Sequence, residues 1–558
     1  MSGYIEQTDH LAAIAERMDQ FEKALVKRWR REIAERVNSD EPIVTSIVRN
    51  TFGNPVPGYL AGQFTSAEWS AHKTYCGTMP HYLEGGDPGD AGRCEGWLDP
   101  NGQPVEVENS SGEMVAIGPK IDCPLDAALA MVDQWAVQER SAIEPSIPKF
   151  QGHDVAKLES AYDAAKKLRE ATLAEYTDVD ISQGGHRDLA GGGDLPGTVA
   201  KIWSKDSESR DWWVGWTGLA ADHVRGNFCT SAGPTLMNHS VIATALGNLV
   251  TTRAAIIEAG RNNGLHLIER ATAALGEVDA SPFTETEGWK SVQSGLDAFS
   301  LWSALGGPLP KAVAAALKLL QFLGDKWFAE VEAHTFADAM VDIVTGLVDG
   351  FIELNDQLDE QEAQYREAAA SAMEAINDAA SFDLELYDLT ENTPGGTDSA
   401  GSAEGYTVDI SNVLTLAEHC ELAGEDYEGL LRHFEDLFDA EPHLADKDGD
   451  PTAADKDVKQ MFADFKGFVK TTSARYYLAH EEIRAAAEAY AQVDEDSAAA
   501  VERTLDSWDR SGVGEVDPGF DVDRAARPTE RDEDASDNPY NGELDGDPNY
   551  YTELNLPR

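Results

Sequence analysis

The chain has 558 residues, which is too long for a single core of ordinary size and predicts several structural units. Apolar residues make up 42% of it, so the chain as a whole is not disordered. It carries 101 Asp and Glu against 44 Lys and Arg, a formal net charge of -57, and such a surface repels phosphate backbones and anionic lipids. We therefore expect no nucleic-acid partner and no binding to a membrane surface. The acidity fits adaptation to high salt as well as the acidic, Ala-rich bias of secreted bacterial helical proteins.

Residues 1–145 are predicted to form one helix followed by an irregular unit that contains strands. Helical periodicity covers residues 4–37, where the basic stretch KALVKRWRRE forms i,i+4 pairs of Arg28 with Glu32 and of Arg31 with Glu35, so most of its charge is interpreted as a solvated helix face. The chain does not open with a basic stretch followed by an apolar one, so no general secretory signal is predicted. Residues 40–122 are rich in Gly, Pro and Asn, and WLDPNGQPVEVENSSGEMVAIGPKID is typical of short strands joined by turns.

Five cysteines are too few for a disulfide scaffold. Cys76, Cys94 and Cys123 lie in the N-terminal part, and one disulfide among them is expected if the protein is exported. No CxxC pair supports a zinc site there. Cys229 and Cys420 are predicted to be small core residues.

The chain from residue 124 onward is predicted to be almost wholly helical. Expected helices cover 124–139 and 154–176, then, after a glycine-rich loop, a helix in pieces to about 274, followed by 286–306, 310–379 and 409–511. The expected units are a helical region with a Gly-rich insertion at 146–280, an amphipathic helical region at 281–382, a flexible linker at 383–408, a C-terminal helical unit at 409–512 and a disordered acidic tail at 513–558. The fold class is therefore mainly α, with elongated helical hairpins or a bundle, a small irregular α+β N-terminal segment and a disordered tail.

The most apolar window is expected at 299–328. Lys311, Lys318 and Lys326 interrupt it at nearly two-turn intervals. This pattern favours an amphipathic packing helix over a membrane span.

A tryptophan-rich stretch, DWWVGWTGLAADHV, covers residues 211–224. Thr217 can cap a helix, a glycine allows a sharp turn, and two alanines allow a neighbouring helix to approach closely, so the stretch is interpreted as a plug at a helix junction. The informative positions are Trp216, Gly218, Ala220 and Ala221. They resemble the WXG family, small helical-hairpin proteins exported by the type VII (ESX) secretion system. The resemblance concerns about residues 150–275, and the segment between the two expected helices is longer here than the family's short turn.

A second resemblance to the same secretion substrates lies near the end of the last expected helix. Those substrates carry a Y-x-x-x-[DE] export signal just after a helical hairpin, and Tyr490 and Asp494 fit it. The same pattern also occurs at Tyr176, Tyr387 and Tyr477. On a helical wheel, Asp494 falls within an apolar stripe made of Ile483, Ala487, Tyr490, Ala498, Val501, Leu505 and Trp508. The hypothesis is that Tyr490 and Asp494 form a recognition pair that an export ATPase binds; self-association is the other expected protein contact.

An acidic loop, DKDGDPTAADKD, invites comparison with a calcium-binding loop. Asp446, Asp448, Asp450 and Asp457 occupy positions 1, 3, 5 and 12 of an EF-hand-like register. Pro451 stands where the sharp turn requires glycine, so a solvated loop is favoured over a weak cation site.

No catalytic fingerprint is present: the sequence has no GxSxG, P-loop, HExxH or Rossmann motif. No enzyme activity and no cofactor are predicted, although a spatial triad within 40–122 stays open. The favoured function is an exported helical protein of the cell surface or exterior that acts through protein–protein interaction, as a structural component or an effector. The alternatives are an exported toxin-like protein with its activity in 1–145 and a cytoplasmic scaffold of a salt-adapted organism.

Overall fold

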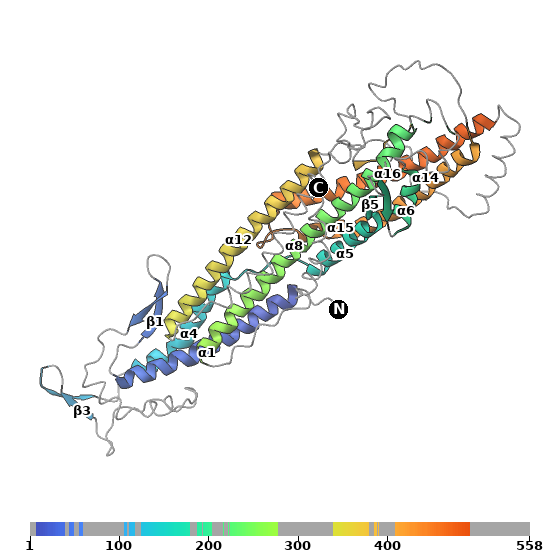
Figure 1. Ribbon diagram of the computed structural model, residues 1–558. Coiled ribbons are helices and arrows are strands. Elements are labelled where there is room, and N and C mark those ends of the chain that lie inside the picture. Colours follow the sequence, from blue (N-terminus) through green and yellow to red (C-terminus); the bar gives the residue numbers. More distant parts are fainter. Residues whose placement is uncertain are drawn as a thin grey trace.

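The computed structural model describes residues 7–39, 44–49, 55–59, 105–108, 111–117, 124–178, 187–191, 193–203, 216, 221, 224–276, 339–378, 384–387, 389 and 408–491. Within these residues the protein is mainly α, an elongated bundle of long helices lying side by side (Figure 1). Several predicted features lie outside them: Cys76, Cys94, Cys123, Gly218, Ala220, Asp494, the apolar window 299–328, most of the linker at 390–407 and the acidic tail at 513–558.

Long helices account for most of the described structure. They are α1 (Gln7–Ser39), α4 (Pro124–Ile143), α5 (Val155–Thr172), α6 (Asp194–Ile202), α8 (Thr230–Ala274), α12 (Met340–Asp378), α14 (Ile410–Leu430), α15 (Phe434–Asp439) and α16 (Ala453–Ala491). A π-helical turn, η4 (Val224–Cys229), leads into α8, and 3₁₀ turns lie at η1 (Glu144–Ser146), η6 (Leu431–His433) and η7 (Glu441–His443).

The strands of the described residues form three antiparallel pairs. They are β1 (Val44–Arg49) with β2 (Pro55–Tyr59), β3 (Val105–Glu108) with β4 (Met114–Ile117), and β5 (Ala174–Asp178) with β6 (Arg187–Gly191). Gly112, just before β4, has a φ of +78°.

The β5–β6 pair corrects two expectations. The helix expected to reach Tyr176 ends at Thr172, because Leu173 adopts an extended backbone (φ −70°, ψ 111°) and the Tyr-Thr pair that follows favours a strand. The glycine-rich segment expected to lack regular structure contains β6 and the start of α6. Tyr176 therefore lies in a strand and not at the end of a helix.

Helix α8 is the central element of the bundle. Its 45 residues span about 67 Å at 1.5 Å per residue, and α1, α5 and α12 pack along it. Its polar residues are tolerated inside because hydroxyls bond back to the preceding turn: Thr244 donates to the Ser240 carbonyl and Thr252 to the Asn248 carbonyl, at 2.7 and 2.8 Å.

Among the described residues, α8 is also the one helix long and apolar enough to cross a membrane, and its apolar window is wholly buried in the bundle. From the sequence, the most apolar window was instead expected at residues 299–328. Residues 230–252 contain no Asp, Glu, Lys or Arg, but Ser, Thr and Asn interrupt the apolar pattern.

Two antiparallel hairpins organise the bundle (Figure 1). In the first, α5 runs back along α8, and Arg261 of α8 contacts the turn just before α5. In the second, the Ser473 hydroxyl of α16 donates to the Gly424 carbonyl of α14 at 2.8 Å, and further along α16 His480 contacts the earlier Ala417 carbonyl. Residues later in α16 contact residues earlier in α14, so the two helices are antiparallel.

A flexible linker was predicted over residues 383–408, but its first residues are not a flexible connection. Residues 384–387 are buried between α8 and α16. His239 of α8 donates to the Leu384 carbonyl at 2.6 Å, and the Leu386 amide donates to Thr472 of α16 at 3.2 Å. Helix side chains thus satisfy the backbone of an irregular segment, a pairing that composition does not reveal.

Buried apolar side chains from all the long helices form one continuous core. The predicted units at 146–280, 281–382 and 409–512 therefore share this core within the described residues. Cys229 and Cys420 are both buried, free thiols within it.

Candidate docking groove on α14 and α16

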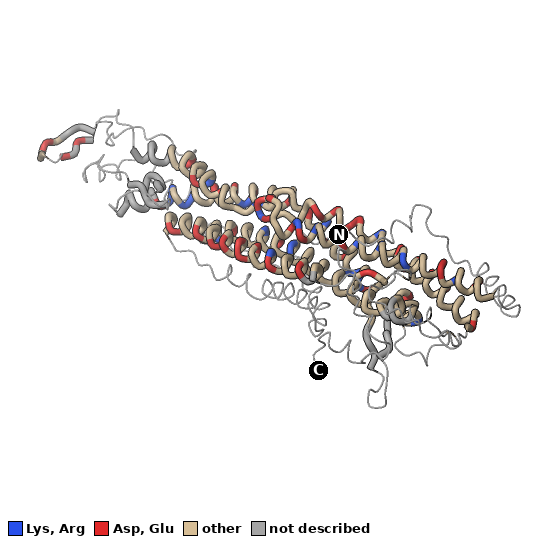
Figure 2. The backbone as a smooth tube through the Cα atoms, turned by 90° about the horizontal axis from the view of Figure 1, so that it is seen from above, with Lys and Arg blue, Asp and Glu red and all other residues tan. Residues whose placement is uncertain are grey.

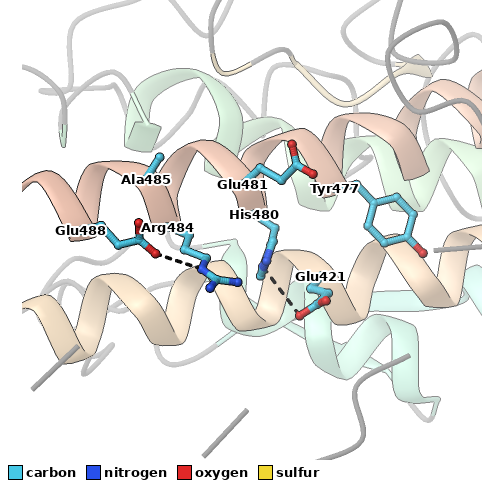
Figure 3. A pocket seen from close by; sticks show the side chains of 7 residues that line it. All are labelled: Glu421, Tyr477, His480, Glu481, Arg484, Ala485 and Glu488. Carbon is cyan, nitrogen blue, oxygen red and sulfur yellow. Dashed lines mark hydrogen bonds and ion pairs between the residues drawn. The ribbon is translucent and has the colours of Figure 1, made fainter. Parts of the chain in front are cut away.

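A groove of about 380 Å³ runs along the α14–α16 hairpin (Figure 3). One lining residue comes from α14 and the others from one face of α16, where they recur every three or four residues. The lining is Glu421, Tyr477, His480, Glu481, Arg484, Ala485 and Glu488. The sequence had pointed to two of these positions, since Tyr477 and Glu481 are one of the Y-x-x-x-[DE] matches.

The floor of the groove is set by a close helix–helix approach. A Cβ at Gly424 would lie 3.1 Å from the Tyr477 ring, so glycine lets the ring lie against α14. The Tyr477 hydroxyl donates to Glu428 Oε2 at 2.7 Å. Burial, followed by this hydrogen bond, raises the pKa of Tyr477. Tyr477 therefore links α16 to α14 through packing and a hydrogen bond.

Charged groups line the rest of the groove. His480 Nδ1 lies 2.9 Å from the Ala417 carbonyl oxygen and 3.7 Å from Glu421 Oε2, and Arg484 pairs with Glu488 at 3.3 Å. Burial raises the pKa of Glu421, an effect that His480 and Arg484 oppose. The lining offers carboxylates, an imidazole and a guanidinium, groups that can form ion pairs with a docked protein.

Tyr490 lies one residue before the end of α16 as the structure describes it. Ile483 and Ala487 are buried, and Tyr490 is half-buried and packs against the core, so these three residues share the face that the apolar stripe predicts. Asp494, the other half of the predicted recognition pair, lies outside the described residues.

Trp216 and Ala221 are the two described residues of the WXG-like motif, and both are buried. They precede η4 and α8 in the chain, and Phe228 and Cys229 of η4 are buried too. Gly218 and Ala220 lie outside the described residues, so the turn itself is not observed.

The acidic loop does not assemble a calcium site. Asp446 Oδ1 accepts hydrogen bonds from the backbone amides of Asp448 and Asp450 at 3.0 and 2.9 Å, so it caps its own turn. Asp457 belongs to α16, and no three acidic, His or Cys side chains of the described chain gather into a metal-binding group.

The sequence did not predict a charged cluster in the centre of the bundle. Arg253 of α8 is fully buried and pairs with Glu362 of α12, and its NH2 lies 3.6 Å from Asp455 Oδ1 of α16. Its guanidinium carbon also lies 4.3 Å from the centroid of the Tyr365 ring. In the sequence, Arg253 is the first charged residue after the uncharged stretch of α8, and this position could have indicated the buried cluster.

Comparison of the chain with protein-family models, with curated proteins and with solved structures gave no match.

Proposed function

We propose that this protein is an exported helical protein similar to type VII secretion substrates, and that it acts through protein–protein contacts as a structural component or an effector. Its export signal would be Tyr490 with Asp494, bound by an export ATPase. We also propose that the protein consists of an N-terminal segment with strands, helical hairpins and a C-terminal tail.

The position of Tyr490 is the observation that carries this proposal. Two copies of the pattern lie on α16, but the Tyr477 hydroxyl is bonded to Glu428 and its ring packs on Gly424 inside the hairpin. Tyr490 packs against the core but keeps part of its surface exposed, in the last described turn of the helix. We therefore assign recognition to Tyr490 and a structural role to Tyr477.

The burial of Trp216 and Ala221 supports the same proposal. Both residues precede the π-helical turn that leads into α8, and a buried tryptophan and a buried small residue at that place are what a WXG-like junction requires. The antiparallel pairing of α5 with α8 supplies the two helices of such a hairpin. The intervening β5, β6 and α6 account for the longer connection.

Export can be measured in a bacterial host that has a type VII system. The variant carrying Tyr490→Ala and Asp494→Ala is expected to stay in the cell while its circular-dichroism melting curve remains cooperative. The matched control is Tyr477→Phe, which loses about 1 kcal/mol of stability with its hydrogen bond but is exported normally.

Secretion of the double variant at the wild-type level would overturn the assignment of the signal. Retention of the wild-type chain in the cell, with full folding only at high salt, would instead favour the salt-adapted scaffold.

A further inference from the structure

Residues 384–387 form a short buried segment whose backbone is bonded to side chains of α8 and α16. On the α8 side, His239 donates to the Leu384 carbonyl at 2.6 Å. Two turns earlier in α8, the Ser231 hydroxyl accepts from the Tyr387 amide at 3.2 Å. The first residue of the segment thus contacts the later residue of α8, so the segment runs antiparallel to that helix.

Helix α16 bonds the middle of the segment. Thr472 accepts from the Leu386 amide at 3.2 Å, and Arg475 donates to the Leu386 carbonyl. The guanidinium of Arg475 also lies 3.7 Å from a carboxylate oxygen of Glu385. Side chains of the two helices thus satisfy two amides and two carbonyls of this segment.

Burial extends from the segment to the groups that bond it. All four side chains of the segment are buried, and so are Ser231, His239, Thr472 and Arg475, which line the slot that the segment fills between α8 and α16. Buried polar groups cost free energy when they lack partners. The donors and acceptors of this slot therefore favour a peptide backbone over an apolar occupant.

The side chains of the segment indicate which peptides the slot accepts. Leu384, Leu386 and Tyr387 are buried, and Glu385 faces the cation of Arg475. Peptide-binding sheets use main-chain hydrogen bonds for affinity and side-chain pockets for specificity, and the slot combines the same two kinds of contact. The pattern that fits it is apolar, acidic, apolar and aromatic.

The fit of the segment is incomplete at His239. Because its Nε2 donates to Leu384, its Nδ1 is an unprotonated acceptor, and this buried atom has no hydrogen-bond partner among the described residues. The ring is flanked by Tyr427 and Phe465, whose ring centroids lie 5.6 and 5.7 Å from its own. A buried acceptor without a donor costs free energy, so a ligand that donates to Nδ1 can displace the segment.

We propose that the slot between α8 and α16 is a peptide-binding site which residues 384–387 occupy in cis, and that a partner protein occupies it in trans through a segment of the same pattern. Because the cis segment belongs to the same chain, its high local concentration keeps the slot filled until such a partner is present. This binding site does not depend on the export signal at Tyr490.

Fluorescence anisotropy with a labelled synthetic peptide tests the slot. The probe has the sequence of residues 382–390, FDLELYDLT. In the double variant Leu384→Ala with Leu386→Ala, the cis segment loses buried apolar surface, so the probe is expected to bind about tenfold more tightly than to the wild-type chain. Probe and protein are both acidic, so no nonspecific attraction between them is expected.

Two controls separate binding in the slot from a general loss of stability. Met18→Ala with Leu25→Ala removes buried apolar groups of α1, which packs near the other end of α8, where Arg17 pairs with Glu269. This variant should bind the probe no better than the wild type. Adding Arg475→Ala to the double variant removes the cation that faces the acidic position, and should weaken binding about tenfold.

If the double variant does not fold, Glu385→Gln replaces it, because this change weakens the ion pair of the cis segment and keeps its packing; tighter probe binding is again expected. Equal binding by the wild type and a folded variant would overturn the peptide-binding site, and so would binding that Arg475→Ala leaves unchanged. Sedimentation velocity of the wild type gives one further outcome. Dimers that the probe dissociates would assign the slot to a second copy of this chain and overturn its assignment to a partner protein.

Discussion

The centre of the bundle and the α14–α16 groove use the same residue types in opposite surroundings. Around Arg253 and Arg261, arginine, histidine and carboxylates are withdrawn from water between several helices. In the groove, Arg484 and Glu488 form a similar pair with 43% and 45% of their side chains exposed. Sequence pattern does not separate these two settings, since Asp and Glu are spread along the whole described bundle (Figure 2).

The difference shows where charge matters for stability and where it is available for binding. A buried pair has lost its hydration, so each partner depends on the other. An exposed pair keeps its water and contributes little, which leaves its charges available to a docking protein. The centre therefore links α8, α12 and α16 through buried charges, while the groove can be changed at small cost to folding.

The largest expected effect comes from removing Arg253. Arg253→Ala leaves Glu362 and Asp455 buried without their cation and should lower the free energy of unfolding by about 3–5 kcal/mol. Equilibrium unfolding in urea at neutral pH measures this change. A loss below about 1 kcal/mol would mean that the two carboxyls are hydrated or neutral, and the comparison with the groove would fail.

Glycine-to-alanine exchanges sharpen the comparison by testing packing. At Gly260 of α8, a Cβ would lie 2.4 Å from the Phe150 ring, so Gly260→Ala should cost about 1–3 kcal/mol through overpacking. At Gly429 of α14 no atom lies within 4 Å of the added Cβ, and Gly429→Ala should stabilise the helix by about 0.5–1 kcal/mol. Thermal melts of the two variants should move in opposite directions, and equal shifts would contradict the packing described for α8.

The smallest effect is expected in the groove. Arg484→Ala breaks the exposed pair with Glu488 and should change stability by about 0.5 kcal/mol or less. Added salt should reduce even this difference, because it screens exposed charges. A salt-independent loss of several kcal/mol would show that the groove pair is energetically similar to the Arg253 cluster.

Much of the helical framework follows from sequence, because apolar residues at helical spacing must face a core. The expected helix over residues 4–37 corresponds to α1, that over 154–176 to α5, which ends four residues earlier, and the C-terminal unit to α14 and α16. The candidate site was predicted less well. The stripe that contains Ile483 and Ala487 located the buried face of α16 and favoured Tyr490, but it did not predict that Tyr477 would link α16 to α14.

What the sequence determined by itself is local: helical periodicity, turn residues and an acidic composition. Only the tertiary structure decided that residues 384–387 are buried rather than a linker, that Arg253 and Arg261 are inside, and that Tyr477 links α16 to α14. Each of these depends on a side chain from a distant segment meeting a backbone group or charge, such as His239 with Leu384 or Arg261 with His153. Contacts of that kind are set by how helices pack in three dimensions, and one-dimensional spacing does not encode them in a readable pattern.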